Sequence, residues 1–319
     1  MADITRTDAA ALIRDAYAND FHEKAYKTSQ VLQAFPTVNM GTKTHTMPVL
    51  ASKPHAKWVG ETAGGDGVKP TSKATWGAKQ LVAEEVAVIV PVHENVVDDA
   101  TEDILAEIAG LGGEAIGFAL DAAVAFGTNK PASWTSPDLM AAATAAGQVH
   151  QVSATPGEDD LVGSIYQAAG ALDDAGLDPT TFLSRGGMRY RLANLRNTDG
   201  TPIYLPTLAT SPGSGQVDNV AGLSAYWLSG TVLDSASQEV PVWDRAVAEA
   251  LVVDRNRVRI GVRQDITVKF LDQATVGGIN LAENDMVALR FKARYAYVLA
   301  DREDATPVAA ITPAAAPAG

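Results

Sequence analysis

The side chains that most often carry out chemistry in proteins are sparse in this sequence. The chain has no cysteine, which excludes disulfides, thiolate catalysis and cysteine-based zinc sites. Its five histidines are His22, His45, His55, His93 and His150. No two of them stand four residues apart, so the paired histidines of a helical zinc site are missing. We therefore predict no metal site.

Two other patterns contain residue types found in phosphate-binding or catalytic sites, but their sequence context does not fit such a site. Residues 60–67, GETAGGDG, resemble a phosphate loop in their glycines but lack the Gly-Lys-Ser/Thr that completes one, so we expect a turn. The carboxylate pairs at 84–85 and 98–99 could serve as general acids or metal ligands. Adjacent residues of a strand point apart, which favours solvated charges or a helix cap. We predict no catalytic residue and no cofactor, and favour a binding or structural role over an enzyme.

Composition limits the class of protein further. The chain has 319 residues, of which 46% are hydrophobic, enough for a large core. Its formal net charge of -13 argues against a surface that grips nucleic acid. The first residues have no basic segment followed by an apolar run, so we expect no signal peptide.

The element around which the chain is organised is a long helix predicted over residues 100–127. Apolar residues recur in it at helical spacing, and Asp99 with Glu102 suits an N-terminal cap. The helical apolar residues are Ile104, Leu105, Ile108, Leu111, Ala115, Ile116, Ala119, Leu120, Ala122 and Val124. The opposite face carries Asp103, Glu107, Glu114 and Asp121. This acidic stripe leads us to expect no membrane span. The glycines within the helix would let another backbone come close to it.

A long β-hairpin with a glycine-rich tip is predicted over residues 41–80. It has few core-forming side chains, yet Trp58 and Trp76 flank the tip almost symmetrically. Because tryptophan is costly to leave in water, we favour an arm that packs outside its own fold over a mobile loop. The hairpin is rich in lysine, whereas residues 80–129 contain no Lys or Arg. The basic hairpin is therefore expected either to be merely solvated or to cover an acidic helix, its own or a neighbour's.

The remaining segments divide into parts of different character. Residues 1–40 read as an arm whose helical face includes Tyr17 and Phe21, docked either on its own domain or on a neighbour. Residues 81–92 are strand-like, and residues 128–157 are rich in loops. Residues 158–256 read as an α/β lobe, and residues 257–303 as two long alternating strands. The tail, residues 304–319, is rich in Ala and Pro and is expected to be disordered.

The order of these parts resembles the major capsid protein of tailed bacteriophages, of the Hong Kong 97 (HK97) type. Residues 56–61, AKWVGE, are similar to the hairpin signature of that family. Residues 92–99, VHENVVDD, resemble the segment that enters the long helix, and residues 118–127, FALDAAVAFG, resemble its end. Residues 183–200 resemble a strand, helix and Asp-Gly turn of the lobe. Together these matches cover most of residues 40–300.

The resemblance implies an α+β, HK97-like capsid fold with named parts. These would be the N-arm at 1–40, the extended loop at 41–80, the peripheral domain at 81–157 with its spine helix at 100–127, the axial domain at 158–256, the return strands of the peripheral domain at 257–303, and the tail at 304–319. We see no cleavable scaffolding segment before the arm, and no asparagine matches that of members whose subunits crosslink.

The resemblance also implies a function. The protein would assemble with many copies of itself, as hexamers and pentamers, into an icosahedral virion shell around double-stranded DNA. Its partners would be a portal and scaffolding or decoration proteins, with assembly in the host cytoplasm and no membrane. The alternatives are an encapsulin-like cellular shell around a cargo, and a soluble enzyme or binding protein that uses the 158–256 lobe. The candidate intersubunit contacts are Trp58, Glu61, Trp76, Lys57, Lys73, Asp103, Glu107, Glu114, Tyr17 and Phe21.

Overall fold

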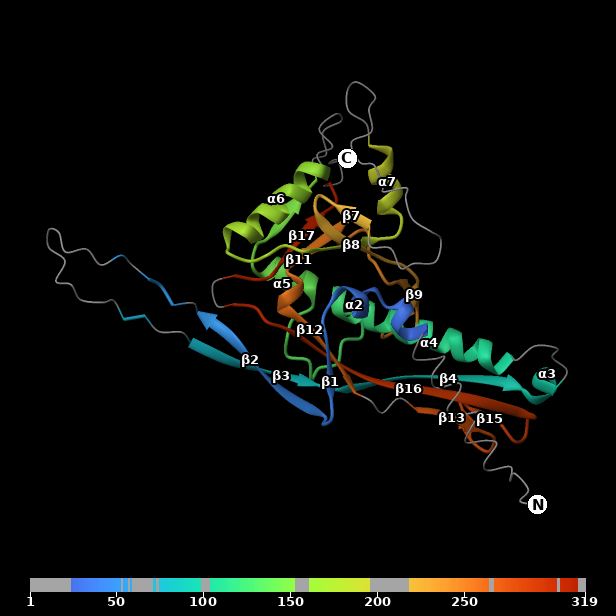
Figure 1. Cartoon of the computed structure of the whole chain (residues 1–319). Coiled ribbons are helices and arrows are strands. Elements are labelled where there is room, and N and C mark those ends of the chain that lie inside the picture. The colour runs from blue at the N-terminus through green and yellow to red at the C-terminus, as the bar shows by residue number, and fades with distance from the viewer. Residues whose placement is uncertain are drawn as a thin grey trace, which may run out of the picture.

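Two sheets, each with helices against it, build the body of the protein, and a long hairpin projects from it (Figure 1). A computed structural model describes residues 24–52, 54–56, 58, 71–72, 75–98, 104–152, 161–195, 218–263, 267–302 and 305–314. The expected cap residues Asp99 and Glu102 lie outside the described residues.

The first sheet is built around β16 (Met286–Leu299), the longest strand described. Its strand order is β1 (Thr37–Met40), β12 (Val258–Arg263), β16 and β13 (Thr267–Leu271), with β4 (Glu84–His93) also paired to β16. Residues 288–292 of β16 pair with both β13 and β4, so these two strands flank β16 on opposite sides. The alternation predicted for residues 257–303 is thereby confirmed as strands β12 and β16 of one sheet.

The helix α4 (Ile104–Phe126) packs on this sheet, and its described part confirms the predicted long helix. Ile116, Leu120 and Val124 are buried between helix and sheet, where β16 contributes Phe291. The apolar face was only partly predicted, since Leu111 is 58% exposed. The helix also meets its neighbours through glycines, as at Gly112 beside Leu111, where a Cβ would lie 2.7 Å from the Phe291 ring.

We expect Gly112→Ala to destabilise the fold, although alanine is the better helix former. The added methyl would collide with the buried Phe291, and overpacking of this kind costs about 1–3 kcal/mol. Gly110→Ala is the matched control, because a Cβ there meets only the Lys24 side chain at 3.9 Å. The control should gain up to about 1 kcal/mol from helix propensity. Denaturant unfolding of both variants measures the difference, and equal stabilities would contradict the close packing of α4 on β16.

The second sheet forms a separate lobe with the order β5, β17, β11, β6, β8 and β7. Its strands are β5 (Val149–Gln151), β6 (Thr181–Arg185), β7 (Asp218–Val220), β8 (Leu223–Leu228), β11 (Ala250–Val253) and β17 (Val308–Thr312). Helices α5 (Leu139–Ala145), α6 (Leu161–Asp174) and α7 (Met188–Asn194) belong to this half of the molecule. Its core includes Leu161, Phe182 and Val252.

The expectation of a disordered tail is wrong for residues 308–312. These residues form β17, which lies between β5 and β11 and has Val308, Ala309, Ala310 and Ile311 fully buried. Composition misled because the tail as a whole is rich in Ala and Pro, whereas β17 itself reads VAAIT. Its two alanines fit where α5 and α6 contact the strand. The sheet of the lobe thus draws on both sides of the predicted 158–256 segment.

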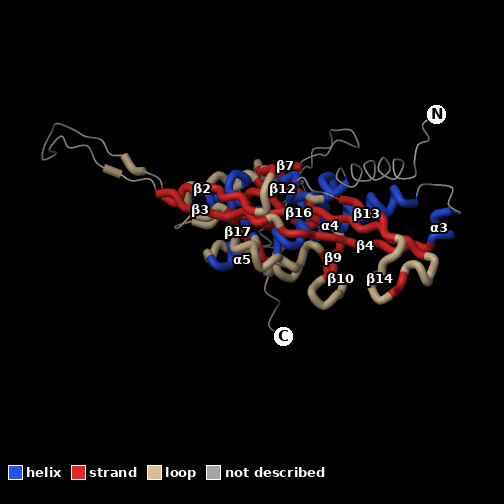
Figure 2. The backbone as a smooth tube through the Cα atoms, turned by 90° about the horizontal axis from the view of Figure 1, so that it is seen from below, coloured by secondary structure: helices blue, strands red, loops and turns tan. Residues whose placement is uncertain are grey.

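The hairpin consists of β2 (Thr44–Ser52) and β3 (Thr75–Val82), paired with each other from Thr44↔Val82 to Ser52↔Thr75. The strand predicted at 81–92 is therefore divided, because Ala83 separates β3 from β4. Figures 1 and 2 both show β2 and β3 leaving one end of the body while α4 runs toward the other. Shorter elements complete the description: α2 (Gln30–Ala34), α3 (Glu94–Asp98), β9 (Thr231–Leu233), β10 (Glu239–Pro241), a 3-10 turn (Arg255–Arg257), β14 (Thr275–Val276) and β15 (Ile279–Asn280).

Candidate functional site: the assembly surfaces

The described part of the hairpin presents two large aromatic side chains to solvent. Trp58 is 101% exposed and Trp76 is 67% exposed. An indole can bury 150–250 Å² when it packs, so both are costly to leave in water. The candidate contacts Lys57, Glu61 and Lys73 lie outside the described residues. The two tryptophans thus mark an apolar surface carried on an arm.

Ion pairs hold the base of the hairpin to its own body. The Lys79 ammonium pairs with Asp301 and donates to the Leu299 carbonyl at 2.9 Å. Lys43 pairs with Glu84 at 3.4 Å. The described hairpin leads away from its own α4 in both backbone views, so the interpretation that it covers its own acidic helix is wrong for this part of the chain (Figures 1 and 2). The exposed tryptophans of the described hairpin are therefore not covered by its own α4.

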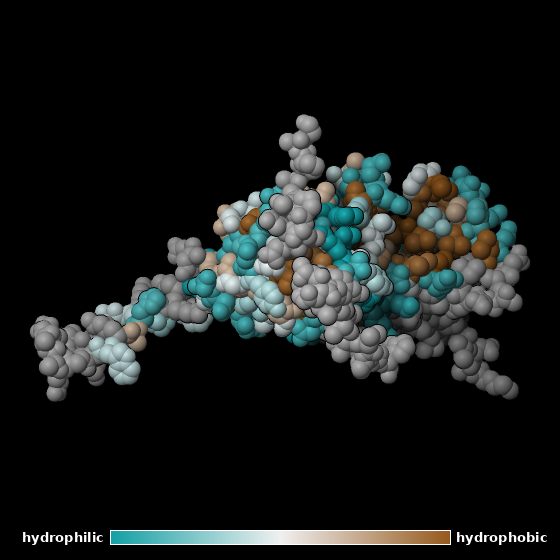
Figure 3. Space-filling model, turned by 90° about the horizontal axis from the view of Figure 1, so that it is seen from above, coloured by the Kyte–Doolittle hydropathy of each residue, from teal (hydrophilic) through white to brown (hydrophobic). Residues whose placement is uncertain are grey.

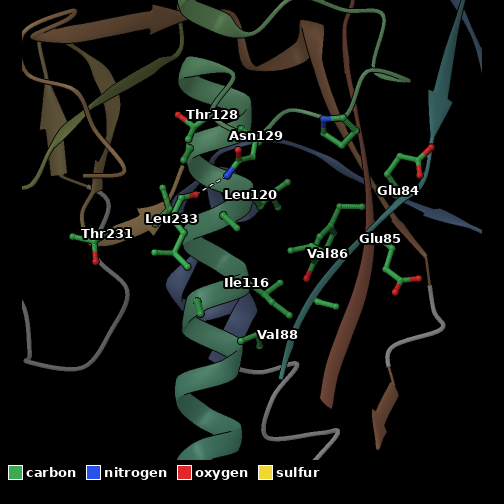
Figure 4. Close-up of a pocket in the computed structure, with 18 of the residues that line it drawn as sticks. Glu84, Glu85, Val86, Val88, Ile116, Leu120, Thr128, Asn129, Thr231 and Leu233 are labelled. Carbon is green, nitrogen blue, oxygen red and sulfur yellow. Dashed lines mark hydrogen bonds between the residues drawn. The ribbon is translucent and has the colours of Figure 1, made fainter. Parts of the chain in front are cut away.

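An apolar groove with a volume of about 500 Å³ lies on α4. Figure 4 shows its arrangement: α4 contributes Ile116 and Leu120, β4 contributes Val86 and Val88, and β9 contributes Thr231 and Leu233. Asn129 closes one end by donating its side-chain amide to the Leu233 carbonyl at 2.6 Å. The groove lining includes three glutamates, Glu84, Glu85 and Glu239, and no basic residue.

The predicted acidic stripe of α4 is divided among three environments. Glu107 is exposed and Glu114 is half-buried, whereas Asp121 is only 1% exposed. Asp103 lies outside the described residues. Figure 3 shows hydrophobic surface gathered at the end of the molecule away from the hairpin. Val96 on α3 is 49% exposed and Leu111 on α4 is 58% exposed.

Asp121 fixes the start of α2 to α4. Its carboxylate accepts the Ser29 hydroxyl at 2.6 Å, the Gln30 amide at 2.9 Å and the Val31 amide at 3.1 Å. Ser29 in turn accepts the Leu32 amide as the N-cap of α2. Burial raises the pKa of Asp121 to about 7, although all three donors act to lower it.

The backbones of α4 and the segment before α2 also come close together. A Cβ at Gly117 would lie 3.2 Å from the Ala25 carbonyl oxygen and from the Ser29 amide nitrogen. Val31, Leu32 and Phe35 are buried against the same core as α4. The described part of the predicted arm, from residue 24 to 40, therefore docks on its own domain. Tyr17 and Phe21 lie outside the described residues.

Comparison with known proteins decides the family. The model of the phage capsid family matches residues 9–309. The chain belongs to the phage capsid family.

Solved structures agree with this assignment. A protein of Mycobacterium phage Bobi is 54% identical, with a TM-score of 0.72, and the match covers 99% of this chain and 100% of that one. A protein of Microbacterium phage Oxtober96 is 38% identical over 98% and 100% of the two chains, with a TM-score of 0.71. The capsid of an empty GTA particle, 15% identical, shares the fold with a TM-score of 0.60 over 90% of each chain. The comparison with curated proteins finds no match.

Membership of this family identifies the protein as a major capsid protein with an α+β, HK97-like fold, which forms the shell of a phage virion. Capsid proteins associate with copies of themselves, so other copies of this chain are available to cover its exposed apolar surface. Among the residues that the structure describes, no three His, Asp or Glu side chains gather as a metal site.

Sequence reasoning missed two parts of these surfaces. Asp121 was assigned to the acidic stripe opposite the apolar face. The residues one helical turn away, Gly117, Phe118, Val124 and Ala125, are all non-polar, which was the available signal for burial. The groove depends on β9 meeting α4 across more than a hundred residues, which no local pattern reports. In addition, residues 107–126 are long and apolar enough to cross a membrane by length and composition, contrary to expectation, but 67% of the 18-residue window is buried, as in a core helix.

Proposed function

We propose that this capsid protein assembles as hexamers and pentamers into an icosahedral head around the double-stranded DNA of a tailed phage. The observation that carries the proposal is the fully exposed Trp58 on an arm that leaves its own body. Such an arm has a stabilising role only if another copy buries it. Closed symmetric assembly then repeats each modest contact around the shell.

Each segment of the chain would form one part of the capsid subunit. Residues 1–40 serve as the N-arm, 41–80 as the extended loop, and 81–157 with 257–303 as the peripheral domain built on α4. Residues 158–256 serve as the axial domain around the symmetry axes, and the buried β17 supports including residues 308–312 in that domain. The contacts between copies involve Trp58, Trp76, Glu107 and Glu114 from the described residues, and Tyr17, Phe21, Lys57, Glu61, Lys73 and Asp103 from the rest.

The protein would enclose DNA without reading its sequence. Its net charge of -13 keeps the wall from holding packaged DNA in place, and portal, scaffolding or decoration proteins would complete the head. Assembly would take place in the host cytoplasm. A purely structural role, with no catalysis, accords with the family and with the sparse chemical side chains.

The charges of the hairpin give a testable consequence. Reversing Lys57 and Lys73 to Glu should weaken assembly about tenfold at low salt, because the lysines would face the acidic helix region of a neighbour. The loss should shrink as salt screens the charges. Light scattering during assembly across a salt series measures this, and matched Lys57→Gln and Lys73→Gln variants separate lost attraction from added repulsion. Identical assembly of the reversed and wild-type proteins at every salt concentration would contradict the charge complementarity.

Electron microscopy of negatively stained protein tests the proposal as a whole. We expect hollow closed particles from the purified chain or from infected cells, with nuclease-protected DNA in the virions. A protein cargo in place of DNA would instead indicate an encapsulin-like compartment. A chain that stays monomeric at high concentration would contradict shell assembly.

A further inference from the structure

The groove on α4 contains a buried hydroxyl group that has no hydrogen-bond partner. Tyr295 is only 2% exposed and lines the groove. It lies on β16 opposite Glu84 of β4, and it belongs to the same buried cluster as Ile116 and Leu120 of α4. Among the residues that the structure describes, no donor or acceptor reaches its hydroxyl oxygen. Because a buried hydroxyl without a partner is costly, it marks a place where a polar atom would be held.

Two other polar side chains of the lining are already hydrogen-bonded. The Asn129 amide donates to the Leu233 carbonyl at 2.6 Å, and the Trp134 indole donates to the Val82 carbonyl at 3.0 Å. Of the buried side-chain atoms without a partner in the described chain, the Tyr295 hydroxyl is the one that belongs to the lining. Burial raises the pKa of Tyr295 to about 12, so its hydroxyl stays protonated at neutral pH and can donate a hydrogen bond.

The rest of the groove is suited to a small apolar molecule. Val86 and Val88 point from β4 toward α4, and Ile116 and Leu120 face them from the helix (Figure 4). The volume of about 500 Å³ lies within the range of small-molecule sites. The lining includes three glutamates and no basic residue, so a negatively charged ligand would be repelled. The groove therefore favours an uncharged ligand.

We propose that the groove on α4 binds a small, uncharged, mainly apolar molecule, and that the Tyr295 hydroxyl donates a hydrogen bond to an oxygen atom of this ligand. The inference goes beyond shell assembly, because nothing in it requires a second copy of the chain. Thr231 and Leu233 of β9 also line the groove, so the ligand contacts α4, β4 and β9 together (Figure 4). A ligand that binds only the folded subunit raises the temperature at which the subunit unfolds.

Three probes of similar shape separate the contributions to binding. Acetylnaphthalene carries a carbonyl oxygen, ethylnaphthalene lacks it, and naphthoate carries a negative charge. Ligand-observed NMR titrations of the free subunit measure the Kd of each probe. We expect the ketone to bind about tenfold more tightly than the hydrocarbon, and naphthoate to bind most weakly. Tyr295→Phe removes only the hydroxyl, so it should weaken binding of the ketone about tenfold and leave binding of the hydrocarbon unchanged.

A second variant locates the site independently of Tyr295. Ala115 is exposed on α4 and lines the groove, so Ala115→Phe should fill the groove and abolish binding of both the ketone and the hydrocarbon. Ala146→Phe is the matched control, because Ala146 is exposed at the end of α5 and lies outside the lining. Circular dichroism verifies that both variants fold.

The outcomes concern the groove alone. Equal affinity of the wild-type protein and Tyr295→Phe for the ketone would overturn the proposed hydrogen bond. Binding that persists in Ala115→Phe, or a water molecule on the Tyr295 hydroxyl together with no binding of any probe, would overturn the site. None of these results bears on shell assembly, which electron microscopy tests separately.

Discussion

Replacing Asp121 with alanine is expected to lower the free energy of unfolding of the free subunit by about 3 kcal/mol. The change removes the acceptor of the Ser29 hydroxyl and of the Gln30 and Val31 amides, all at the junction of α2 with α4. A buried donor left without a partner costs about 1–3 kcal/mol, and the released segment would also expose Phe35. Guanidinium unfolding, followed by circular dichroism, measures the loss.

A matched control is Asp138→Ala. Asp138 caps α5 by accepting the Ala141 amide at 3.0 Å, but this hydrogen bond is exposed to solvent. Loss of such a cap costs about 1 kcal/mol. The two variants therefore remove the same group from a buried and an exposed cap, and equal losses would contradict a special role of Asp121 in anchoring α2.

The same carboxyl group predicts a dependence on pH. Burial raises its folded-state pKa from 3.8 to about 7. Because the folded protein then binds the proton more tightly than the unfolded chain, the contribution to stability is fully present below the unfolded pKa and is lost as pH rises through the folded pKa. Asp121→Asn keeps a carbonyl acceptor and cannot titrate. We expect the wild-type protein to lose stability relative to this variant between about pH 4 and about pH 7, and a constant difference would refute the shifted pKa.

Replacing Trp58 and Trp76 together with alanine should nearly abolish assembly and leave the fold unchanged. Trp58 is fully exposed and Trp76 mostly exposed in the free subunit, so their loss removes little packing from it. Aromatic anchors at interfaces contribute about 2 kcal/mol or more each, and about 2 kcal/mol corresponds to roughly a thirtyfold change in affinity. Sedimentation velocity over a concentration series measures the assembled fraction.

The control for this prediction is Tyr166→Ala, which removes an exposed aromatic side chain from α6. It should assemble at concentrations close to those of the wild-type protein, whereas the double tryptophan variant should not. Trp58→Tyr should restore part of the assembly, because a ring of similar shape can still pack. Normal assembly of the double variant would show that the hairpin makes no energetically important contact.

The sequence correctly predicted the helices and strands in which apolar residues recur at a regular spacing. The long helix follows from apolar residues at helical spacing, and β12 and β16 follow from strict alternation such as Val258, Ile260 and Val262. The hairpin could be predicted because turn-forming residues lie between two extended arms. In the helix and in β12 one face of the element is more buried than the other, so the sequence shows the period of the structure.

The features that the sequence did not reveal depend on distant partners. Asp121 is buried because Ser29 and α2 fold over it, ninety residues away in the chain. β17 is a central strand although its alanines resemble a disordered tail, because β11 and β5 occupy both its edges. Leu111 fits the apolar period of α4 but is exposed, whereas Gly112 beside it lies against Phe291 of the sheet.

Electron cryomicroscopy of assembled wild-type shells tests the central claim most directly, by locating the Trp58 side chain. The account predicts that Trp58 of each copy is buried against a neighbouring copy. A shell in which Trp58 stays in solvent, or folds back onto its own subunit, would contradict the account.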